Sequence, residues 1–321
     1  MGFPDVGKTF LAMAGLVLYS AVAHAGEDEI FRSGFDPPPA ILVQTPQIVV
    51  AAGDEQTYCY YFRAPAGGPL GVHRWHSGMA AGMHHLLLFA TYDSSGNPIE
   101  RQPPGTLTQS PCGIGDGGGQ GIVPYAGPSP DQQLGVPADD GGGLPLAVEI
   151  GPNQPMFVQM HLLNPGTTAL TTSAVVEGEA VAAATSYTKT ATYLATNVSF
   201  SIPPAATGYS VERTCAVPVG ARFWWFSTRT HHFAVQSKIR DGGSDLVVSN
   251  DWEHPAQYTP PGPAYFQFPP SGLTYQCTYD NPGPVTITSG ESETMNEACI
   301  GIGYFFPATR AMFCINDVGP L

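Results

Sequence analysis

The stretch His84-His85-Leu86-Leu87-Leu88-Phe89-Ala90 decides the fold. Leucine and phenylalanine dominate it, and helical periodicity is scarce here as in the rest of the chain. The turn signal Ser95-Gly96-Asn97-Pro98 follows shortly afterwards. A short apolar run bounded by turn residues is typical of a buried β-strand. The sequence therefore predicts a strand over 84–90.

Similar segments, rich in β-branched and aromatic residues, recur along the chain. They cover 43–51, 57–62, 147–150, 156–162, 174–181, 192–202, 223–226, 233–240, 246–249, 273–279, 285–288 and 300–306. Turn signals such as Asn164-Pro165-Gly166 and Asn281-Pro282-Gly283 separate them. Many strands at this spacing favour antiparallel packing over a parallel α/β sheet. We expect an all-β protein made of two tandem, jelly-roll-like β-sandwiches.

The length of the chain also favours two domains. With 321 residues, 38 of them Gly and 32 Pro, the sequence is too long for one ordinary sandwich and rich in turn residues. The small-residue stretch 182–189 lies between two strand-like segments. It places an N-terminal domain at 26–184 and a C-terminal domain at 185–321. The segments 103–125 and 129–144 are expected to be long surface loops of the first domain.

The N-terminus has the pattern of a signal peptide. Lys8 is followed by an apolar stretch over 9–23, and Ala23-His24-Ala25 gives the small-x-small cleavage pattern. We expect residues 1–25 to be removed. No later stretch is apolar enough for a membrane helix, so the mature chain is expected to lack a membrane span and to be secreted or periplasmic.

Charge and cysteine content narrow the class of protein further. The net charge of −14 argues against a nucleic-acid partner, because phosphate binding requires clustered Lys and Arg. Six cysteines in an exported chain predict three disulfides, although spacing alone leaves their pairing open. The absence of a CxxC motif argues against a thiolate zinc site or a thioredoxin-type redox site.

Histidines carry the main functional signal. They occur as His84-His85, as His161 after a strand, as His231-His232 and as His254. Imidazole is a borderline ligand, and with no carboxylate or thiolate evident in these groups the pattern favours copper or zinc. Consecutive strand residues point to opposite faces. His84 and His85 would therefore share a metal only at a strand end or bulge, or through different ring nitrogens. Otherwise one is buried and hydrogen-bonded, and the other is exposed.

Several segments resemble, in order, those of the copper type II, ascorbate-dependent monooxygenases. That family includes the peptidylglycine α-hydroxylating and dopamine β-monooxygenases. Met83-His84-His85-Leu86-Leu87-Leu88-Phe89 resembles its HHMLLF segment, and Gln159-Met160-His161 resembles its QxH segment. Ser227-Thr228-Arg229-Thr230-His231-His232 resembles its HxH segment. Residues 251–255 look like a segment of bacterial members, and residues 277–281, 297–299 and 304–307 resemble the closing hairpin. The resemblance covers roughly residues 40 to 315.

The resemblance implies two copper sites, one in each domain. His84, His85 and His161 match the ligands of the first copper, which stores and delivers an electron. At the second copper, which binds oxygen, only His231 matches. Arg229 replaces the other histidine, and Ala298 replaces the methionine. A guanidinium stays protonated and repels a metal cation, although it would bind an anion or pair with an acidic residue. Substitute ligands near the second site would be His232, Met295 and His254.

The resemblance also implies a disulfide pairing. Cys59 would bond to Cys112, Cys215 to Cys314, and Cys277 to Cys299. The last pair would close the hairpin that carries position 298, and the first would brace the N-terminal domain behind His84 and His85.

Three functional hypotheses follow. The first is an exported copper-binding protein with an intact three-histidine electron-transfer site and a degenerate oxygen site. The second is an active monooxygenase that hydroxylates an aliphatic C–H bond of a small molecule or peptide, using O2 and ascorbate or another reductant. The third is a non-catalytic copper carrier or a structural module.

Overall fold

The leucine-rich run forms strand β5 (Met83–Tyr92), as predicted. It lies beside strand β10 (Pro155–Leu163) in a five-stranded sheet ordered β6-β3-β10-β5-β7. This computed structural model describes residues 40–93, 95–109, 112, 120–127, 130–290 and 292–319. The expected signal peptide lies outside the described residues, as do residues 113–119 of the expected loop 103–125.

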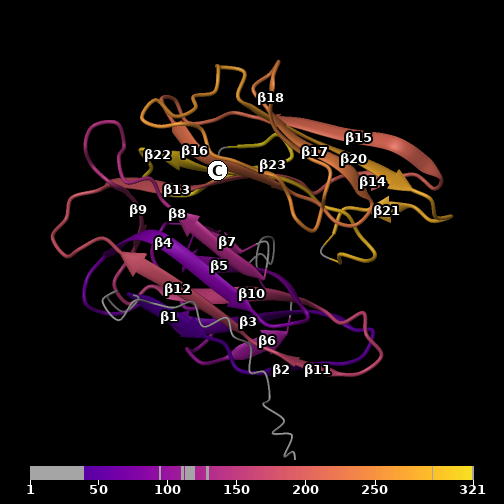
Figure 1. Cartoon of the computed structure of the whole chain (residues 1–321), viewed down its shortest axis with the longest axis horizontal. Coiled ribbons are helices and arrows are strands. Elements are labelled where there is room, and N and C mark those ends of the chain that lie inside the picture. The colour runs from indigo at the N-terminus through magenta and orange to yellow at the C-terminus, as the bar shows by residue number, and fades with distance from the viewer. Residues whose placement is uncertain are drawn as a thin grey trace, which may run out of the picture. The chain divides into compact units, whose positions relative to one another are not determined.

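The described residues contain strands and no helix, which confirms the all-β prediction (Figure 1). The first half holds β1 (Ile41–Gln44), β2 (Ile48–Val50), β3 (Glu55–Arg63), β4 (Leu70–Met79), β5, β6 (Leu107–Gln109), β7 (Gln120–Gly127), β8 (Asp131–Gly135), β9 (Leu146–Ile150), β10, β11 (Leu170–Thr172) and β12 (Ala174–Ala180). The second half holds β13 (Thr188–Asn197), β14 (Ser201–Ile202), β15 (Ala206–Cys215), β16 (Arg222–Arg229), β17 (Ala234–Arg240), β18 (Asp245–Ser249), β19 (Gln257–Tyr258), β20 (Leu273–Asn281), β21 (Ile287–Thr288), β22 (Cys299–Phe306) and β23 (Met312–Ile315).

The first sandwich buries one face of the five-stranded sheet against strands β1, β12, β4 and β9. Side chains alternate along β5: Leu86, Leu88 and Ala90 belong to the main core of this sandwich. Phe89 lies on the opposite face, in a smaller cluster that Leu87 joins as a half-buried neighbour. Because strand side chains alternate between faces, both faces of β5 are covered, which explains why its sequence is a continuous apolar run.

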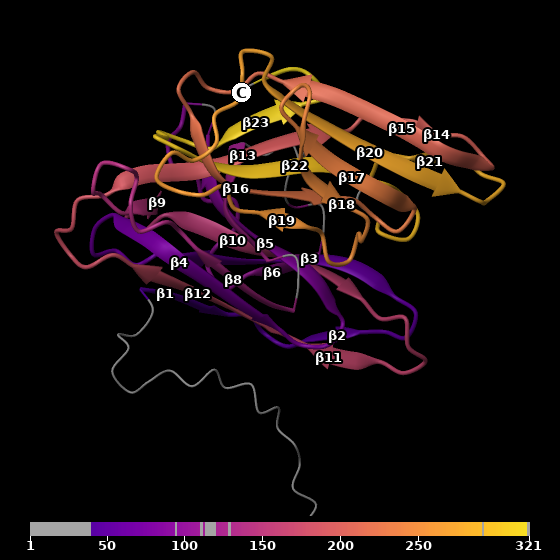
Figure 2. The same ribbon diagram turned by 45° about the horizontal axis from the view of Figure 1, so that its top comes forward.

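The second sandwich is built in a similar way, from β13-β22-β16-β19 and the four-stranded sheet β15-β20-β17-β18. A short parallel pairing of β9 with β13 joins the two halves into one ten-stranded sheet. The strands of this join lie close together in both views (Figures 1 and 2).

Side chains of the second half complete the core of the first. Trp224, Trp225, Ile302 and Tyr304 are buried in the same cluster as the first-sandwich residues. Accordingly, the described residues from Ala40 onward belong to one compact unit. The predicted boundary near residue 184 falls between β12 and β13, where the chain passes from one sandwich to the other.

Several predicted boundaries are wrong for local reasons. The segment 43–51 is two strands, β1 and β2, because Pro46 between them has no N–H for a ladder. Residues 129–144, expected to be a loop, include β8. The expected loop 103–125 includes β6 and the start of β7. Strand β4 lacked a sequence signal, since Gly71 and Gly78 interrupt it and its core side chains, Val72 and Trp75, do not alternate regularly.

The two Asn-Pro-Gly turns fix equivalent corners of the two sandwiches. The Asn164 side-chain amide donates hydrogen bonds to three backbone carbonyls, and its Oδ1 accepts the N–H of Gly166 at 3.1 Å. Asn281 makes the same set of bonds after β20, again with Gly283 N–H at 3.1 Å. Both side chains are buried, so each amide satisfies carbonyls that would otherwise lack a donor.

We therefore expect Asn281→Asp to destabilise the protein by about 2–4 kcal/mol, because the carboxylate cannot donate to the three buried carbonyls. The measurement is the urea midpoint and m-value by circular dichroism. The exposed Asn250→Asp is the control and should change stability by less than about 0.5 kcal/mol. Equal midpoints for the two variants would contradict this role of the turn.

Three disulfides link the described cysteines: Cys59 to Cys112, Cys215 to Cys314, and Cys277 to Cys299. They are the same pairs that the family resemblance implies. Disulfides of this kind are typical of proteins that fold in an oxidising compartment. In the described part of the chain, no helix has the length and apolar character needed to cross a bilayer.

Candidate functional site

Two of the histidines lie directly opposite each other on neighbouring strands. His85 of β5 pairs with His161 of β10, on the face of the five-stranded sheet that points away from the first core. Their rings are stacked with centroids 5.0 Å apart and planes 15° apart. Both side chains are buried, because strands of the second sandwich cover this face.

A β-bulge brings His84 to the same place. The register passes from His161↔His85 to Leu162↔Met83, which leaves His84 as an extra residue on β5. The bulge turns its ring toward its neighbour, and the Nδ1 atoms of His84 and His85 are 3.3 Å apart. The centroid of the His84 ring is 6.2 Å from that of His161. The sequence indicated that two adjacent histidines could share a metal only at a strand end or a bulge, and a bulge is present here.

The second sandwich adds residues to the same cluster. Strand β16 ends at Arg229, and His231 lies two residues further along the chain. The carboxylate oxygen Oε1 of Glu293 lies 3.7 Å from His84 Nδ1, 3.6 Å from His85 Nδ1 and 3.7 Å from His231 Nε2. Arg229 Nη2 donates to the same oxygen at 2.5 Å. Residues expected at two separate centres therefore surround one carboxylate.

Glu55, at the start of β3, holds the segment that carries Glu293. Its carboxylate accepts the backbone N–H of Glu293 at 2.6 Å and the Ser292 hydroxyl at 3.0 Å, and it also accepts the Thr294 hydroxyl. Burial alone would raise the pKa of Glu55, but these hydrogen bonds outweigh it and lower the pKa, so the carboxylate is ionised. His161 Nε2 lies 3.2 Å from Glu55 Oε1.

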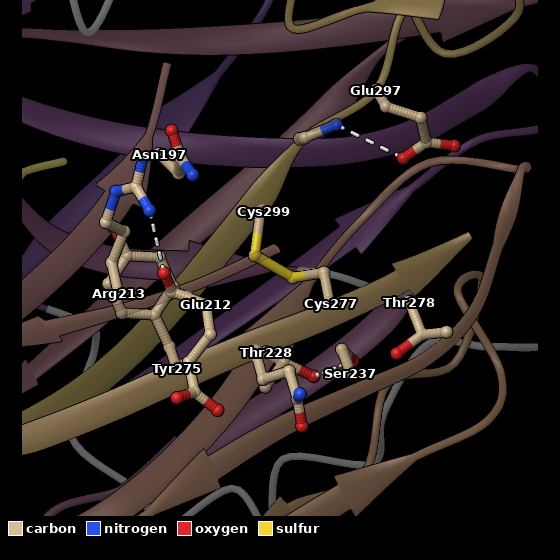
Figure 3. Close-up of a disulfide and its surroundings, with 12 residues drawn as sticks. Asn197, Glu212, Arg213, Thr228, Ser237, Tyr275, Cys277, Thr278, Glu297 and Cys299 are labelled. Carbon is tan, nitrogen blue, oxygen red and sulfur yellow. Dashed lines mark hydrogen bonds between the residues drawn. A yellow bond between two sulfur atoms is a disulfide. The ribbon is translucent and has the colours of Figure 1, made fainter. Parts of the chain in front are cut away.

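A second buried carboxylate fixes the other end of this segment. Glu297 accepts the backbone N–H groups of His231 at 3.0 Å, Phe233 at 2.6 Å and Ala298 at 3.2 Å. The Cys277–Cys299 disulfide lies two residues further along and ties the segment to β20 (Figure 3). Glu297 and the disulfide therefore brace the segment that carries Glu293, and Glu297 also holds the backbone at His231.

Burial keeps the histidine rings neutral. It lowers the pKa of His84 and of His161 to about 4 and that of His231 to about 3, with the positive charge of Arg229 as the second cause in each case. The pKa of His85 is lowered well below its usual value for the same two reasons. Neutral imidazole has a lone pair for a metal, whereas imidazolium has none.

The protonation of His231 follows from its surroundings. Its Nδ1 lies 3.1 Å from the carbonyl oxygen of Asn296. A carbonyl only accepts, so Nδ1 carries the proton and the lone pair of Nε2 points toward Glu293. Burial raises the pKa of Glu293 to about 6 despite the nearby Arg229.

A cavity of about 420 Å³ opens beside the cluster, between the two sandwiches. Its polar end is formed by side chains of the cluster, including His85, His161 and Arg229. Its other walls combine aliphatic side chains such as Leu194 and Ile302 with polar ones such as Thr196 and Asn197. The space next to the histidines is therefore lined by both apolar and polar side chains.

The substitute ligands suggested by the sequence lie elsewhere. Ala298 lines the cavity. Met295 is 73% exposed. His232 is exposed, with its Nδ1 2.6 Å from the backbone carbonyl of Glu293. His254 is exposed beside Asp251, in a surface group with Glu253.

Sequence reasoning missed the two carboxylates of the cluster. Among the described residues, one buried group brings three potential metal-donor atoms within 4.8 Å of one another: His84, His85 and Glu293. His161 is adjacent to this group but is not one of the three. The expectation that no carboxylate accompanies the histidines is corrected, because Glu293 and Glu55 contact them across a large separation in sequence. The acidic character of residues 291–293 was the available signal.

Comparison with known proteins adds little. No family model matches the chain, and no curated protein matches it. Among solved structures, the chain is similar to the major capsid protein P2 of bacteriophage PM2, with 9% identity, 83% of this chain and 96% of that chain covered, and a TM-score of 0.31. It is also similar to the N-glycanase PNGase F, with 9% identity, 82% and 94% coverage, and a TM-score of 0.27. Similarity at this level carries no argument about function.

The lowered pKa values of the four histidines of the cluster predict acid sensitivity of the metal-free protein. The unfolded chain takes up these protons near pH 6.5. The folded chain takes up those of His84, His161 and His231 only near pH 4 or below, and the pKa of His85 is also lowered well below its usual value. Stability is thus lost as pH falls through that window. Glu293 and Glu297, with raised pKa values of about 6 and about 7, act in the opposite sense but are fewer.

We expect the free energy of unfolding to fall by a net amount on the order of 2–5 kcal/mol between pH 7 and pH 5. Each histidine contributes about 1.4 kcal/mol per pH unit, and Glu293 and Glu297 offset part of this loss. Urea unfolding at the two pH values measures it. His231→Gln should reduce the loss, and the exposed His254→Gln should leave it unchanged. A metal-free protein that is equally stable at both pH values would rule out neutral buried rings.

Proposed function

We propose that this is an exported, secreted or periplasmic copper-binding protein. In this proposal His84, His85 and His161 hold one copper ion. The observation that carries the proposal is the convergence of three histidines from two strands, far apart in sequence, on one buried point. The resemblance of residues 83–89 and 159–161 to the copper type II monooxygenases supports the same ligand set.

The donor set fits a metal ion of this kind. Two ligand nitrogens at bond lengths of about 2.0–2.1 Å and a tetrahedral angle lie about 3.3–3.4 Å apart. The Nδ1 atoms of His84 and His85 are 3.3 Å apart. His161 Nε2 is buried without a hydrogen-bond partner, although it lies near Glu55. Small side-chain movements would suffice to direct it to the same ion.

Copper is favoured over other ions by chemistry. The affinity of imidazole sites for divalent first-row metals reaches a maximum at Cu²⁺ and is lower for Zn²⁺. Bound copper would supply one-electron chemistry by changing oxidation state. The chain would hold the imidazoles neutral, exclude water from them through the second sandwich, and stack Trp252 on the exposed side of His84 at 5.3 Å.

Arg229 favours a binding or electron-transfer role over oxygen activation. Its guanidinium cannot ligate a metal, and Ala298 offers no donor atom. Arg229 instead pairs with Glu293 at 2.5 Å. The second half of the family's catalytic machinery would then be replaced by an internal ion pair, so hydroxylation of a substrate with ascorbate or another reductant is the less supported alternative. A copper carrier and a structural module remain the outcomes that the following experiments separate.

We expect His161→Ala to lower copper affinity by more than about 100-fold, since loss of a direct ligand should exceed the 10–100-fold effect of an outer partner. Competition with a chromophoric chelator measures affinity, and metal analysis of the loaded protein gives the stoichiometry. The control, His254→Ala, should bind one copper as the unaltered protein does. Unchanged affinity in the His161 variant would refute the assignment. If the unaltered protein binds no copper at all, the structural module is the hypothesis that remains.

The double variant Arg229→His with Ala298→Met should gain a second copper, because it restores two missing ligands beside His231. The measurement is copper content per chain after dialysis, together with ascorbate-dependent oxygen uptake. The single variant Arg229→Lys is the control, since lysine keeps the charge. If the double variant still binds one copper, the mapping of the second site is wrong. Two coppers with oxygen uptake in the unaltered protein would instead establish the monooxygenase.

A further inference from the structure

We propose that Glu293 is a further ligand of this centre, so that one metal ion held by His84, His85 and His161 of the first sandwich is also bound by Glu293 of the second and links the two sandwiches. This inference rests on the proposed metal-binding function and extends it. It replaces two separate centres, one in each half of the chain, with a single centre whose ligands come from both halves.

The first argument is geometric. The donor atoms of His84, His85 and Glu293 lie within 4.8 Å of one another. The Glu293 oxygen is 3.7 Å from His84 Nδ1 and 3.6 Å from His85 Nδ1, while the two nitrogens are 3.3 Å apart. Separations of this size suit three atoms bound at about 2.0–2.2 Å to one ion. Ligation therefore requires little movement of strand β5 or of the segment that carries Glu293.

The second argument is an unsatisfied buried atom. The Glu293 side chain is 1% exposed, and its second oxygen, Oε2, has no hydrogen-bond partner. A buried carboxylate oxygen without a hydrogen-bond partner destabilises the folded state, and such atoms are rare in folded proteins. Arg229 donates to Oε1, the oxygen that also faces His84 and His85. A metal ion bound to both carboxylate oxygens would use a remaining lone pair of Oε1 and satisfy Oε2 at the same time.

The third argument concerns charge. Glu293 and Glu55 face the histidines with two negative charges, whereas Arg229 supplies one positive charge. Two carboxylates thus face one guanidinium in a place largely shielded from water, where an excess of charge of one sign is costly. A cation bound among the histidines offsets this excess and attracts the carboxylates and the imidazole lone pairs at once.

The fourth argument is preorganisation. Glu293 cannot swing freely, because Glu55 of the first sandwich binds its backbone N–H and both neighbouring hydroxyls. Glu297 and the Cys277–Cys299 disulfide fix the other end. Ligands supported in this way hold metals more tightly. Arg229 then has a positioning role, since it orients the Glu293 carboxylate toward the histidines.

A carboxylate ligand should also change the preference for oxidation state. A negative oxygen donor stabilises a divalent ion more than a monovalent one, whereas neutral imidazole serves both. The mixed centre should therefore favour Cu²⁺ over Cu⁺ by comparison with a site built from histidine alone. This difference separates ligation by Glu293 from a purely structural role.

The test compares Glu293→Gln with the exposed Glu212→Gln in the full chain, using Cu²⁺ and Cu⁺ each against a chelator of known affinity. Glu293→Gln should lower Cu²⁺ affinity by about 10-fold or more and Cu⁺ affinity by clearly less. Glu212→Gln should change neither. Equal losses for both oxidation states, or no loss for Cu²⁺, would overturn the proposal.

The His161→Ala variant keeps this outcome separate from the proposed function. If His161→Ala abolishes binding but Glu293→Gln does not weaken it, the copper site stands and the joint centre is wrong. If neither variant changes affinity, both are wrong. Should Glu293→Gln fail to fold, hydrogen exchange of the unaltered protein decides: Cu²⁺ should slow exchange at residues 293–297, and unchanged exchange there contradicts the inference.

Discussion

The alternation of side chains along β5 and β10 is the constraint on which the rest of the structure depends. Leu86, Leu88 and Met160 are buried in the first sandwich, so His85 and His161 must point away from it. A sheet face that carries buried imidazoles needs a cover that excludes water. Strands of the second sandwich supply this cover. The second half is therefore needed to create the environment in which these histidines are neutral.

The same constraint explains why a bulge occurs at His84. Without the shift in register, His84 would point into the core beside Leu86, where a polar ring would lack a partner. The bulge removes it from the ladder and directs it toward His85, at the edge of the interface between the sandwiches. Such irregularities interrupt pairing, and they persist where surrounding contacts stabilise them. The stacking of Trp252 on His84 is one such contact.

The fold was predictable from the sequence because strand patterns and turn residues are local signals. The all-β class and the central strands followed from apolar runs such as that of β5, and the Asn-Pro-Gly turns marked the corners. Strands β4 and β15 were not predicted, because their polar and glycine residues acquire a buried face only through their neighbours. The contacts of the site were harder to predict. Glu55 and Glu293 meet the histidines through loop docking, and no periodicity in the sequence reports a contact between residues so far apart.

The pair formed by Arg229 and Glu293 changes what the interface between the sandwiches can do. An ion pair that is buried on one side gains little free energy over an apolar contact, because both groups lose hydration. Its value lies in orientation: a guanidinium has fixed donor directions and holds a carboxylate in one place. Glu55 acts on the backbone of the same segment from the other side. The cluster is thus fixed by both halves of the chain, so loss of any one anchor should loosen the interface and the arrangement of the histidines together.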